Sequence, residues 1–148
     1  MKDKVILLVE DSERDEELAL RALRKNNIQN VVVVARDGEE ALDYMLGTGA
    51  YAGRNPADIP TLMLLDIKLP KIDGLEVLRR LRADERTKLT PIVILTSSKE
   101  DKDRIEGYTS GANSYVRKPI EFVEFAEAVR QLGLYWLILN EPPPAADA

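Results

Sequence analysis

The 148-residue sequence predicts an α/β fold, a doubly wound parallel sheet with helices on both faces. Two observations support this prediction. Short runs rich in Val, Ile and Leu, of the length of buried strands, alternate five times with segments of helical periodicity. No internal repeat or interdomain linker interrupts the pattern, and a chain of this length buries roughly two thirds of its unfolded surface in one core. We therefore expect one domain with five strands, five helices and right-handed crossovers.

The first two strand–helix units occupy the N-terminal third of the chain. Residues 4–9 are an apolar run that predicts a buried strand. Ser12 and Asp15 have the spacing of a capping box, which predicts the start of a helix. Residues 31–34 predict a second buried strand. Asp37 is the expected N-cap of the next helix, whose apolar face consists of Ala41, Leu42, Met45 and Leu46.

The third unit follows a loop at residues 47–60, which contains three Gly and two Pro. This loop exceeds the usual length of a connection, so it is either functional or a feature of a subfamily. Residues 62–65 are apolar without interruption and predict a strand that is buried on both faces. Asp66 comes directly after this strand, and a helix is expected from about residue 74 to residue 84.

The last two units complete the pattern. Residues 92–95 predict a fourth buried strand, and the capping-box spacing of Ser98 and Asp101 predicts the helix after it. Residues 114–117 are more polar, which places the fifth strand at an edge of the sheet. The last helix is expected to begin near Ile120 and to bury a stripe at three- and four-residue steps, formed by Phe122, Phe125, Ala126, Val129, Leu132, Gly133, Trp136 and Leu137.

Polar residues with complementary chemistry follow four of the five strands: Glu10 and Asp11 after the first, Asp66 after the third, Thr96 after the fourth and Lys118 after the fifth. The carboxyl ends of parallel strands share one edge of the sheet, where such folds bind ligands. Three carboxylates stay ionised together only beside a cation, and Mg²⁺ prefers oxygen ligands and often binds with phosphate. A hydroxyl and an ammonium group donate to phosphoryl oxygens, and Asp forms aspartyl-phosphates. The residues predict a Mg²⁺-dependent phosphoaspartate site with Asp66 as the nucleophile.

Composition excludes several other kinds of function. The chain has no Cys, which removes disulfides, thiolate catalysis and Cys-based metal sites. It has no His, which removes the commonest general base and zinc ligand and any role as the histidine donor of a phosphoryl group. A net charge of −5 argues against nucleic-acid binding. No apolar run approaches the roughly 20 residues of a membrane span and no signal peptide is present, so we expect a cytoplasmic protein.

Five short stretches, in this order and on these expected elements, resemble the motifs of bacterial response-regulator receiver domains over about residues 4–132. Each stretch is weakly informative alone, and the set is highly specific. The stretches are Val9-Glu10-Asp11-Ser12, Leu65-Asp66-Ile67-Lys68-Leu69-Pro70-Lys71-Ile72-Asp73-Gly74, Leu95-Thr96-Ser97-Ser98, Gly111-Ala112 and Tyr115-Val116-Arg117-Lys118-Pro119.

The resemblance implies a fold, a reaction and a role for each site residue. It implies the flavodoxin-like strand order 2-1-3-4-5, phosphorylation of Asp66 by a sensor histidine kinase, and no turnover of a separate substrate. It implies that Asp11 and Asp66 bind Mg²⁺ directly, Glu10 through water and Lys68 through its backbone carbonyl. It further implies that the Thr96 hydroxyl and the Lys118 ammonium bind the phosphoryl group, that the Lys118–Pro119 bond is cis, and that the Tyr115 rotamer follows the position of Thr96.

The C-terminal part of the chain departs from a minimal receiver domain. Residues 134–139 are apolar nearly all round, so one helix face cannot bury them, and we expect a homodimer through this helix and the fifth strand. Residues 1–141 are expected to form one domain and 142–148 a disordered tail without an output domain. The long loop, the extended helix and the stand-alone form resemble the single-domain regulators that are paired with bacterial and cyanobacterial phytochromes.

Three alternatives to a switching phosphoprotein stay open or are weighed against it. A haloacid-dehalogenase-type phosphatase also uses an Asp after a strand but needs a second Asp two positions later, where this chain has Lys68. A receiver-like scaffold that is never phosphorylated would not need the complete set of polar residues that follow the strands: Glu10, Asp11, Asp66, Thr96 and Lys118. A phosphate sink or relay would use the same site without a downstream target. The kinase, its stimulus, the target and the phosphoryl lifetime do not follow from the sequence. Lys68 and Ser97 lie at positions that vary among family members, so we expect them to tune this lifetime.

Overall fold

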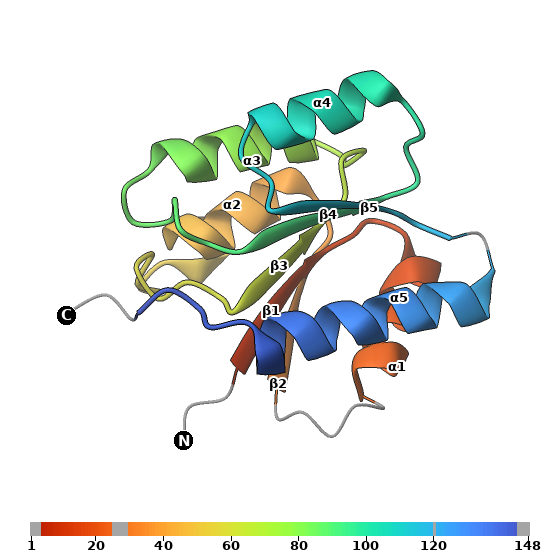
Figure 1. Cartoon of the computed structure of the whole chain (residues 1–148). Coiled ribbons are helices and arrows are strands. Elements are labelled where there is room, and N and C mark those ends of the chain that lie inside the picture. The colour runs from red at the N-terminus through yellow and green to blue at the C-terminus, as the bar shows by residue number, and fades with distance from the viewer. Residues whose placement is uncertain (1–3, 25–29, 120, 145–148) are drawn as a thin grey trace.

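The computed structural model describes residues 4–24, 30–119 and 121–144. Its centre is a five-stranded sheet in the order β2-β1-β3-β4-β5, in which every neighbouring pair is parallel (Figure 1). The predicted doubly wound fold and the flavodoxin-like strand order are confirmed. The strands are β1 Lys4–Val9, β2 Asn30–Ala35, β3 Leu62–Leu65, β4 Ile92–Thr96 and β5 Ser114–Arg117.

Helices cover both faces of this sheet. In Figure 1, α2, α3 and α4 lie above the sheet, and α1 and α5 lie below it. The five helices are α1 Glu13–Arg24, α2 Gly38–Leu46, α3 Gly74–Ala83, α4 Asp101–Thr109 and α5 Phe122–Leu134. A 3₁₀ turn (η1, Gly49–Tyr51) follows α2, and a π-helix (η2, Tyr135–Leu139) continues α5. Within the described residues, no helix is long and apolar enough to cross a membrane.

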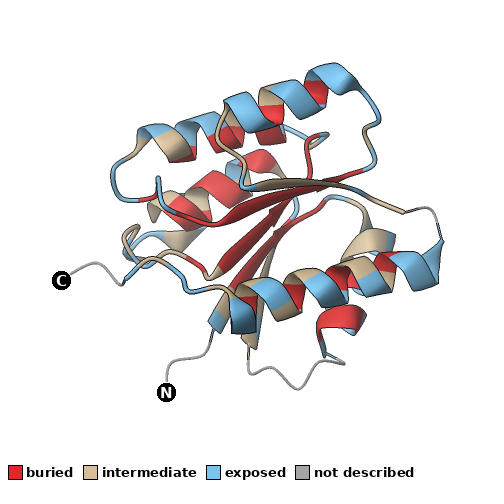
Figure 2. Ribbon diagram, viewed as in Figure 1, coloured by how far each residue is buried: buried red, intermediate tan, exposed pale blue. Residues whose placement is uncertain are grey.

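Successive residues of the central strands pack on opposite faces of the sheet. Leu7 and Val9 of β1 belong to the core that includes α2 and α3, whereas Ile6 and Leu8 belong to the core that includes α1 and α5. The same alternation holds in β3 and β4, whose residues are all buried (Figure 2). A strand buried on both faces needs apolar residues at every position, which explains the uninterrupted apolar run at 62–65.

The prediction of a buried second strand is wrong in one respect. β2 forms where expected, but it lies at the edge of the sheet, and only Ala35 among its residues is buried. Val31 is 43% exposed. A run of valines has the apolar pattern of a central strand. Only the strand order shows that β2 pairs with β1 alone and lies at the edge of the sheet.

Two of the three predicted N-terminal helix caps are confirmed. The Asp15 backbone N–H donates to the Ser12 hydroxyl at 3.2 Å, and the Glu40 backbone N–H donates to Asp37 Oδ1 at 2.7 Å. The third is wrong, because α4 begins after Glu100, whose side chain makes no cap. The Ser98 hydroxyl donates instead to the carboxylate of Asp103 in the first turn of α4.

The loop at 47–60 is anchored to the helix before it. The Arg54 guanidinium lies 4.0 Å from the centre of the Tyr44 ring and donates to the Tyr44 carbonyl at 2.8 Å. Tyr51 of the 3₁₀ turn packs edge-on against the same ring. The loop is therefore an ordered extension of α2, held by one arginine and by two tyrosine rings that pack edge to face.

The extended final helix is confirmed, and its apolar end is only partly buried. The predicted start at Ile120 falls outside the described residues, and α5 begins at Phe122. In η2, Leu137 is buried, whereas the other apolar side chains include three that are strongly exposed: Tyr135, Ile138 and Leu139. Of the predicted tail, residues 142–144 form neither helix nor strand, and residues 145–148 fall outside the described residues.

Candidate functional site

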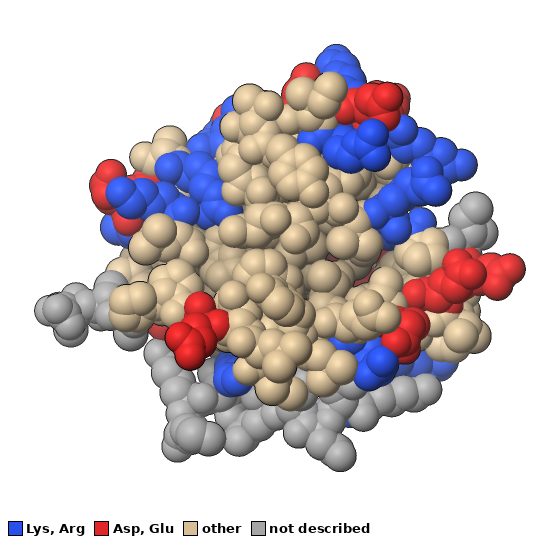
Figure 3. All heavy atoms as spheres, viewed as in Figure 1, with Lys and Arg blue, Asp and Glu red and all other residues tan. Residues whose placement is uncertain are grey.

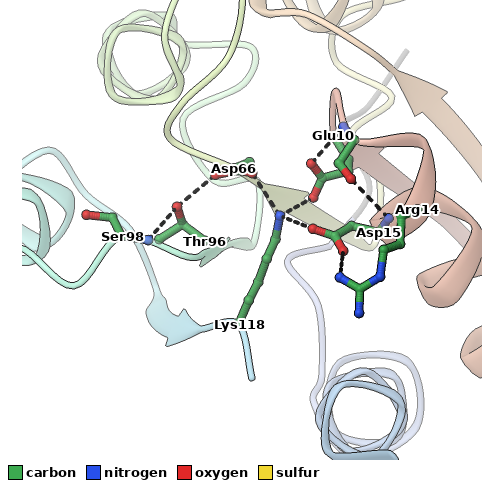
Figure 4. Close-up of polar contacts among 8 residues, drawn as sticks. Glu10, Arg14, Asp15, Asp66, Thr96, Ser98 and Lys118 are labelled. Atoms are coloured by element: carbon green, nitrogen blue, oxygen red, sulfur yellow. Dashed lines mark hydrogen bonds and ion pairs between the residues drawn. The ribbon is translucent and has the colours of Figure 1, made fainter. Parts of the chain in front are cut away.

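The polar residues that follow the strands lie together at one edge of the sheet, as predicted (Figure 4). The Asp66 backbone N–H donates to the Val9 carbonyl, so the ends of β1 and β3 stay in register beyond the strands. The Lys118 backbone N–H donates to the Thr96 carbonyl, and this bond keeps the ends of β4 and β5 in register. Because these pairings are backbone hydrogen bonds, the side chains start from fixed positions.

The loop between β3 and α3 also limits where Asp66 can lie. A Cβ atom on Gly74 would lie 2.0 Å from the carbonyl oxygen of Asp66, so only glycine allows α3 to begin this close to the site. Asp73 caps α3 by accepting from the Glu76 backbone N–H at 3.0 Å. The sequence Asp73-Gly74 therefore fixes both the start of the helix and the distance between that helix and Asp66.

Lys118 is the centre of the site. Its ammonium group donates to Glu10 Oε1 at 2.5 Å, to Asp66 Oδ2 at 2.9 Å and to Asp15 Oδ2 at 3.0 Å (Figure 4). The Lys118 side chain is only 7% exposed, and Glu10 and Asp66 are buried as well. An ammonium group has three protons, and all three have carboxylate acceptors here.

Burial and charge change the protonation equilibria of this cluster. Burial raises the pKa of Glu10 from its ordinary value of 4.5 to about 7, against the opposing effect of the Lys118 ammonium. Burial alone would lower the pKa of Lys118, but the Asp66 and Glu10 carboxylates raise it above its ordinary range. Lys118 therefore stays charged at neutral pH, and Glu10 is the group whose proton is gained or lost there.

Thr96 contacts the other oxygen of Asp66. Its hydroxyl group, which is fully buried, donates to Asp66 Oδ1 at 2.7 Å and accepts from the Ser98 backbone N–H at 3.3 Å. Asp66 thus has one donor on each carboxylate oxygen: a hydroxyl group from β4 and an ammonium group from β5. These are the donors that an added phosphoryl group would need.

The carboxylates also fit a divalent cation. Glu10, Asp11 and Asp66 each offer an oxygen, and these oxygens lie within 4.8 Å of one another. Asp11 is exposed, whereas the other two are buried, so the group is open to solvent on one side. Three oxygen ligands with room for water suit Mg²⁺ or a similar hard ion. The described contacts do not test the predicted role of the Lys68 carbonyl.

Asp15 is a site residue that the sequence analysis missed. Its sequence signal was present, because it lies four positions after Asp11 at the start of the helix that follows the acidic pair. Its spacing from Ser12 predicts only a capping box, whereas its carboxylate also accepts a hydrogen bond from Lys118. The first turn of α1 therefore contributes both a helix start and a fourth carboxylate.

Tyr115 lies one element away from Asp66, in β5. Its hydroxyl group is buried without a hydrogen-bond partner among the described residues, and burial raises its pKa. A Cβ atom on Gly107 of α4 would lie 3.2 Å from the Tyr115 ring, so the ring packs closely under that helix. The expectation of a cis Lys118–Pro119 bond is wrong for this structure, in which the described residues contain no cis peptide; trans is the form that X–Pro bonds ordinarily prefer.

Comparison with known proteins identifies this arrangement. Response regulator receiver domains match residues 6–130, most of the chain. The chain belongs to the response-regulator receiver family. It is 35% identical over 134 residues to response regulator Rcp1 of Synechocystis, which covers 90% of this chain and 89% of Rcp1. Receiver domains are the part of two-component systems that histidine kinases phosphorylate.

Solved structures of similar receiver proteins agree with this result. The phosphorylated cyanobacterial phytochrome response regulator RcpA is 34% identical with a TM-score of 0.90, over 97% of this chain and 100% of RcpA. The Mn²⁺-bound form of Rcp1 is 34% identical with a TM-score of 0.89, over 95% and 99% of the two chains. The bacteriophytochrome response regulator AtBRR is 50% identical with a TM-score of 0.74, over 95% and 100%. The acidic cluster and the Mn²⁺-bound relative together indicate a divalent-metal site.

Proposed function

We propose that Asp66 accepts a phosphoryl group from a sensor histidine kinase. The observation that supports this most directly is the pair of donors on the Asp66 carboxylate, Thr96 on Oδ1 and Lys118 on Oδ2. An Asp66 oxygen forms the new bond to phosphorus while the bond between phosphorus and the kinase's histidine nitrogen breaks. The electron pair of that bond stays on the imidazole, and no other reactant is required.

Lys118 and Thr96 have separate tasks in this reaction. Lys118 holds Asp66 in place before transfer and balances charge on the phosphoryl oxygens afterwards. Thr96 follows the new oxygens by exchanging its hydrogen bond to the carboxylate for one to the phosphoryl group. The space that Thr96 leaves is then open to Tyr115, whose buried hydroxyl makes no hydrogen bond within the described part of the chain. This movement transmits the modification to the surface formed by α4 and β5.

We propose Mg²⁺ as the ion at this site. Asp11 and Asp66 would bind it directly, Glu10 through water, and the Lys68 carbonyl would complete the protein ligands. When bound, the ion supplies positive charge that offsets the carboxylates and the incoming phosphoryl oxygens. The residues of this chain orient Asp66 and keep Lys118 charged, whereas Glu10 must lose its proton before it can act as a ligand.

The partner that we propose is a phytochrome-type histidine kinase of the cytoplasm. Support comes from the relatives named for phytochromes, one of which is 50% identical over nearly the whole chain. The protein acts on its own Asp66 and not as a turnover enzyme on a separate substrate, and nucleic acid is not a partner. Its domain comprises residues 1–141, followed by the tail 142–148.

We further propose that two copies of the chain associate through the C-terminal helix and β5. Figure 3 shows a broad band of uncharged side chains across the face that includes the β5 edge, with Lys and Arg at its upper margins. Exposed apolar residues include Val123 at 73% and Leu139 at 71%. Exposed apolar side chains on α5 and η2 support an interface on this part of the molecule. Sedimentation of the protein with Ile138→Glu and Leu139→Glu tests it: the proposal expects a lighter species, and an unchanged mass contradicts it.

Phosphorylation itself is tested with acetyl phosphate, Mg²⁺ and intact-mass measurement. We expect a phosphoryl-sized gain that disappears with Asp66→Asn and that is kept with Asp84→Asn, a matched change far from the site. No gain with several small donors and with a phytochrome kinase would favour the unphosphorylated scaffold. A gain without any change in partner binding would favour the phosphate sink or relay.

A further inference from the structure

Asp103 is a buried carboxylate outside the acidic cluster. Three acidic residues are buried in the described part of the chain, and two of them, Glu10 and Asp66, belong to the site. The third is Asp103 in the first turn of α4, which is 5% exposed. Acidic residues are common in this turn because of the helix dipole, but the dipole does not require burial. Asp101, in the same turn, is 82% exposed.

The contacts of Asp103 lead back to the site along two chain segments. The Ser98 hydroxyl donates to Asp103 Oδ2 at 2.6 Å, and the Lys68 ammonium lies 3.6 Å from the same oxygen. Ser98 comes two residues after Thr96, and its backbone N–H donates to the Thr96 hydroxyl. Lys68 comes two residues after Asp66. Asp103 therefore contacts both loops that leave the central strands of the site.

Packing does not explain the position of the Lys68 side chain, since it is 66% exposed. Its ammonium is paired with one carboxylate, Asp103, and its backbone begins about 7 Å from that of Asp66. A phosphoryl group on Asp66 would bring up to two negative charges into the reach of this side chain. The ammonium would then have two competing anions, the Asp103 carboxylate on one side and the phosphoryl oxygens on the other.

We infer that Asp103 is a positioning residue that holds Lys68 away from the phosphoryl position, and that phosphorylation of Asp66 transfers Lys68 from Asp103 to the phosphoryl oxygens. The inference rests on the proposed function of Asp66. The ion pair between Asp103 and Lys68 must break before Lys68 can reach the phosphoryl group, so this pair disfavours the phosphorylated state. After transfer, Asp103 retains only the hydroxyl of Ser98, so the first turn of α4 loses its tie to the loop that follows β3.

The test uses beryllofluoride with Mg²⁺ as a probe that mimics the phosphoryl group, and its affinity is measured by titration calorimetry. Asp103→Asn keeps the size of the side chain and removes the charge, so we expect about two- to fivefold tighter binding, the size of a partly exposed ion pair. Asp101→Asn is the matched control in the same helical turn and should leave the affinity unchanged. In a protein that already carries Lys68→Met, Asp103→Asn should have no effect.

A second pair of variants covers the case in which Asp103→Asn does not fold. Lys68→Met should weaken beryllofluoride binding by about two- to fivefold. Lys71→Met, which removes an equally exposed lysine paired with Asp37, should not. An Asp103→Asn effect that persists beside Lys68→Met, or no effect of either variant, would overturn the inference. Failure of the unmodified protein to bind beryllofluoride would instead reject the proposed function.

Discussion

Lys118→Met is the change that tests the charge balance of the site. Methionine keeps most of the length and apolar volume of lysine and removes the ammonium group. The structure gives this ammonium three carboxylate partners at 2.5 to 3.0 Å and an environment in which the side chain is 7% exposed. Without it, Glu10 and Asp66 are buried beside each other without their cation.

The expected loss of stability is limited by protonation. A buried carboxylate that has lost its cation escapes the full penalty by binding a proton. The cost of that proton grows by about 1.4 kcal/mol for each pH unit above the pKa of the group. Removing one partner of a buried pair typically costs about 3–5 kcal/mol. We therefore expect Lys118→Met to lower the free energy of unfolding by about 3–4 kcal/mol without metal.

The loss should depend on pH and on metal in defined directions. The folded variant binds more protons than its unfolded chain, so its stability falls as pH rises. At lower pH the compensating proton costs less, so the difference from the unmodified protein should shrink. Mg²⁺ supplies a replacement cation, and at about 100 times its dissociation constant it should return about 2.7 kcal/mol.

Urea unfolding in EDTA and in Mg²⁺, at two pH values, measures all of these effects. Lys88→Met is the control, because Lys88 pairs with an exposed glutamate and should cost less than about 1 kcal/mol. A loss for Lys118→Met that is the same at both pH values and in both solutions would refute the reasoning. It would mean that the side chain contributes packing and not charge.

Three further predictions follow from the same structure. Gly74→Ala should lower stability by about 1–3 kcal/mol and slow labelling of Asp66 by acetyl phosphate, since the new methyl group presses on the Asp66 carbonyl; normal labelling would contradict this. The affinity for Mg²⁺, measured by calorimetry, should fall as pH decreases through about 7, because the raised pKa of Glu10 leaves a proton that the ion must displace; a flat profile would contradict it. Arg82 donates to the carbonyls of Lys88, Thr90 and Gly111, which a lysine could not all reach. Arg82→Lys should therefore lower the free energy of unfolding in urea by about 2 kcal/mol, and the exposed Arg79→Lys should change it very little. Equal losses for the two variants would contradict that reasoning.

The fold could be predicted from sequence because its information is local. Each strand is a short apolar run and each helix has its own periodicity, so the elements are found one at a time. The acidic cluster could also be predicted, because Glu10, Asp66 and Lys118 each follow a strand and parallel strands bring these positions to one edge. Only the strand order needed the family resemblance, and strand order is what decides that β2 is an edge strand.

The contacts that could not be predicted depend on side-chain direction. Ser98 lies three residues before Asp101, a spacing that predicts a helix cap, yet the hydroxyl bonds Asp103 because α4 begins two residues later than expected. Asp15 has the correct spacing for a cap and makes it, but its carboxylate also reaches Lys118 from α1. One residue can satisfy a local pattern and a distant partner together, and the sequence displays only the local one.

The balance of charge at the site explains why a metal ion should precede the phosphoryl group. Glu10, Asp11, Asp15 and Asp66 carry four formal negative charges when ionised, and Lys118 carries one positive charge, so the net charge is −3. A donor that brings an anionic phosphoryl group is repelled by this cluster. A divalent ion held by these carboxylates would reduce the net charge to −1 and would favour the ionised form of Glu10. Lys118 would then be less needed to neutralise the three carboxylates and would be available to the incoming oxygens. On this argument the metal changes the role of Lys118 as well as adding its own charge, and a phosphodonor without the ion meets an ammonium that is already fully occupied.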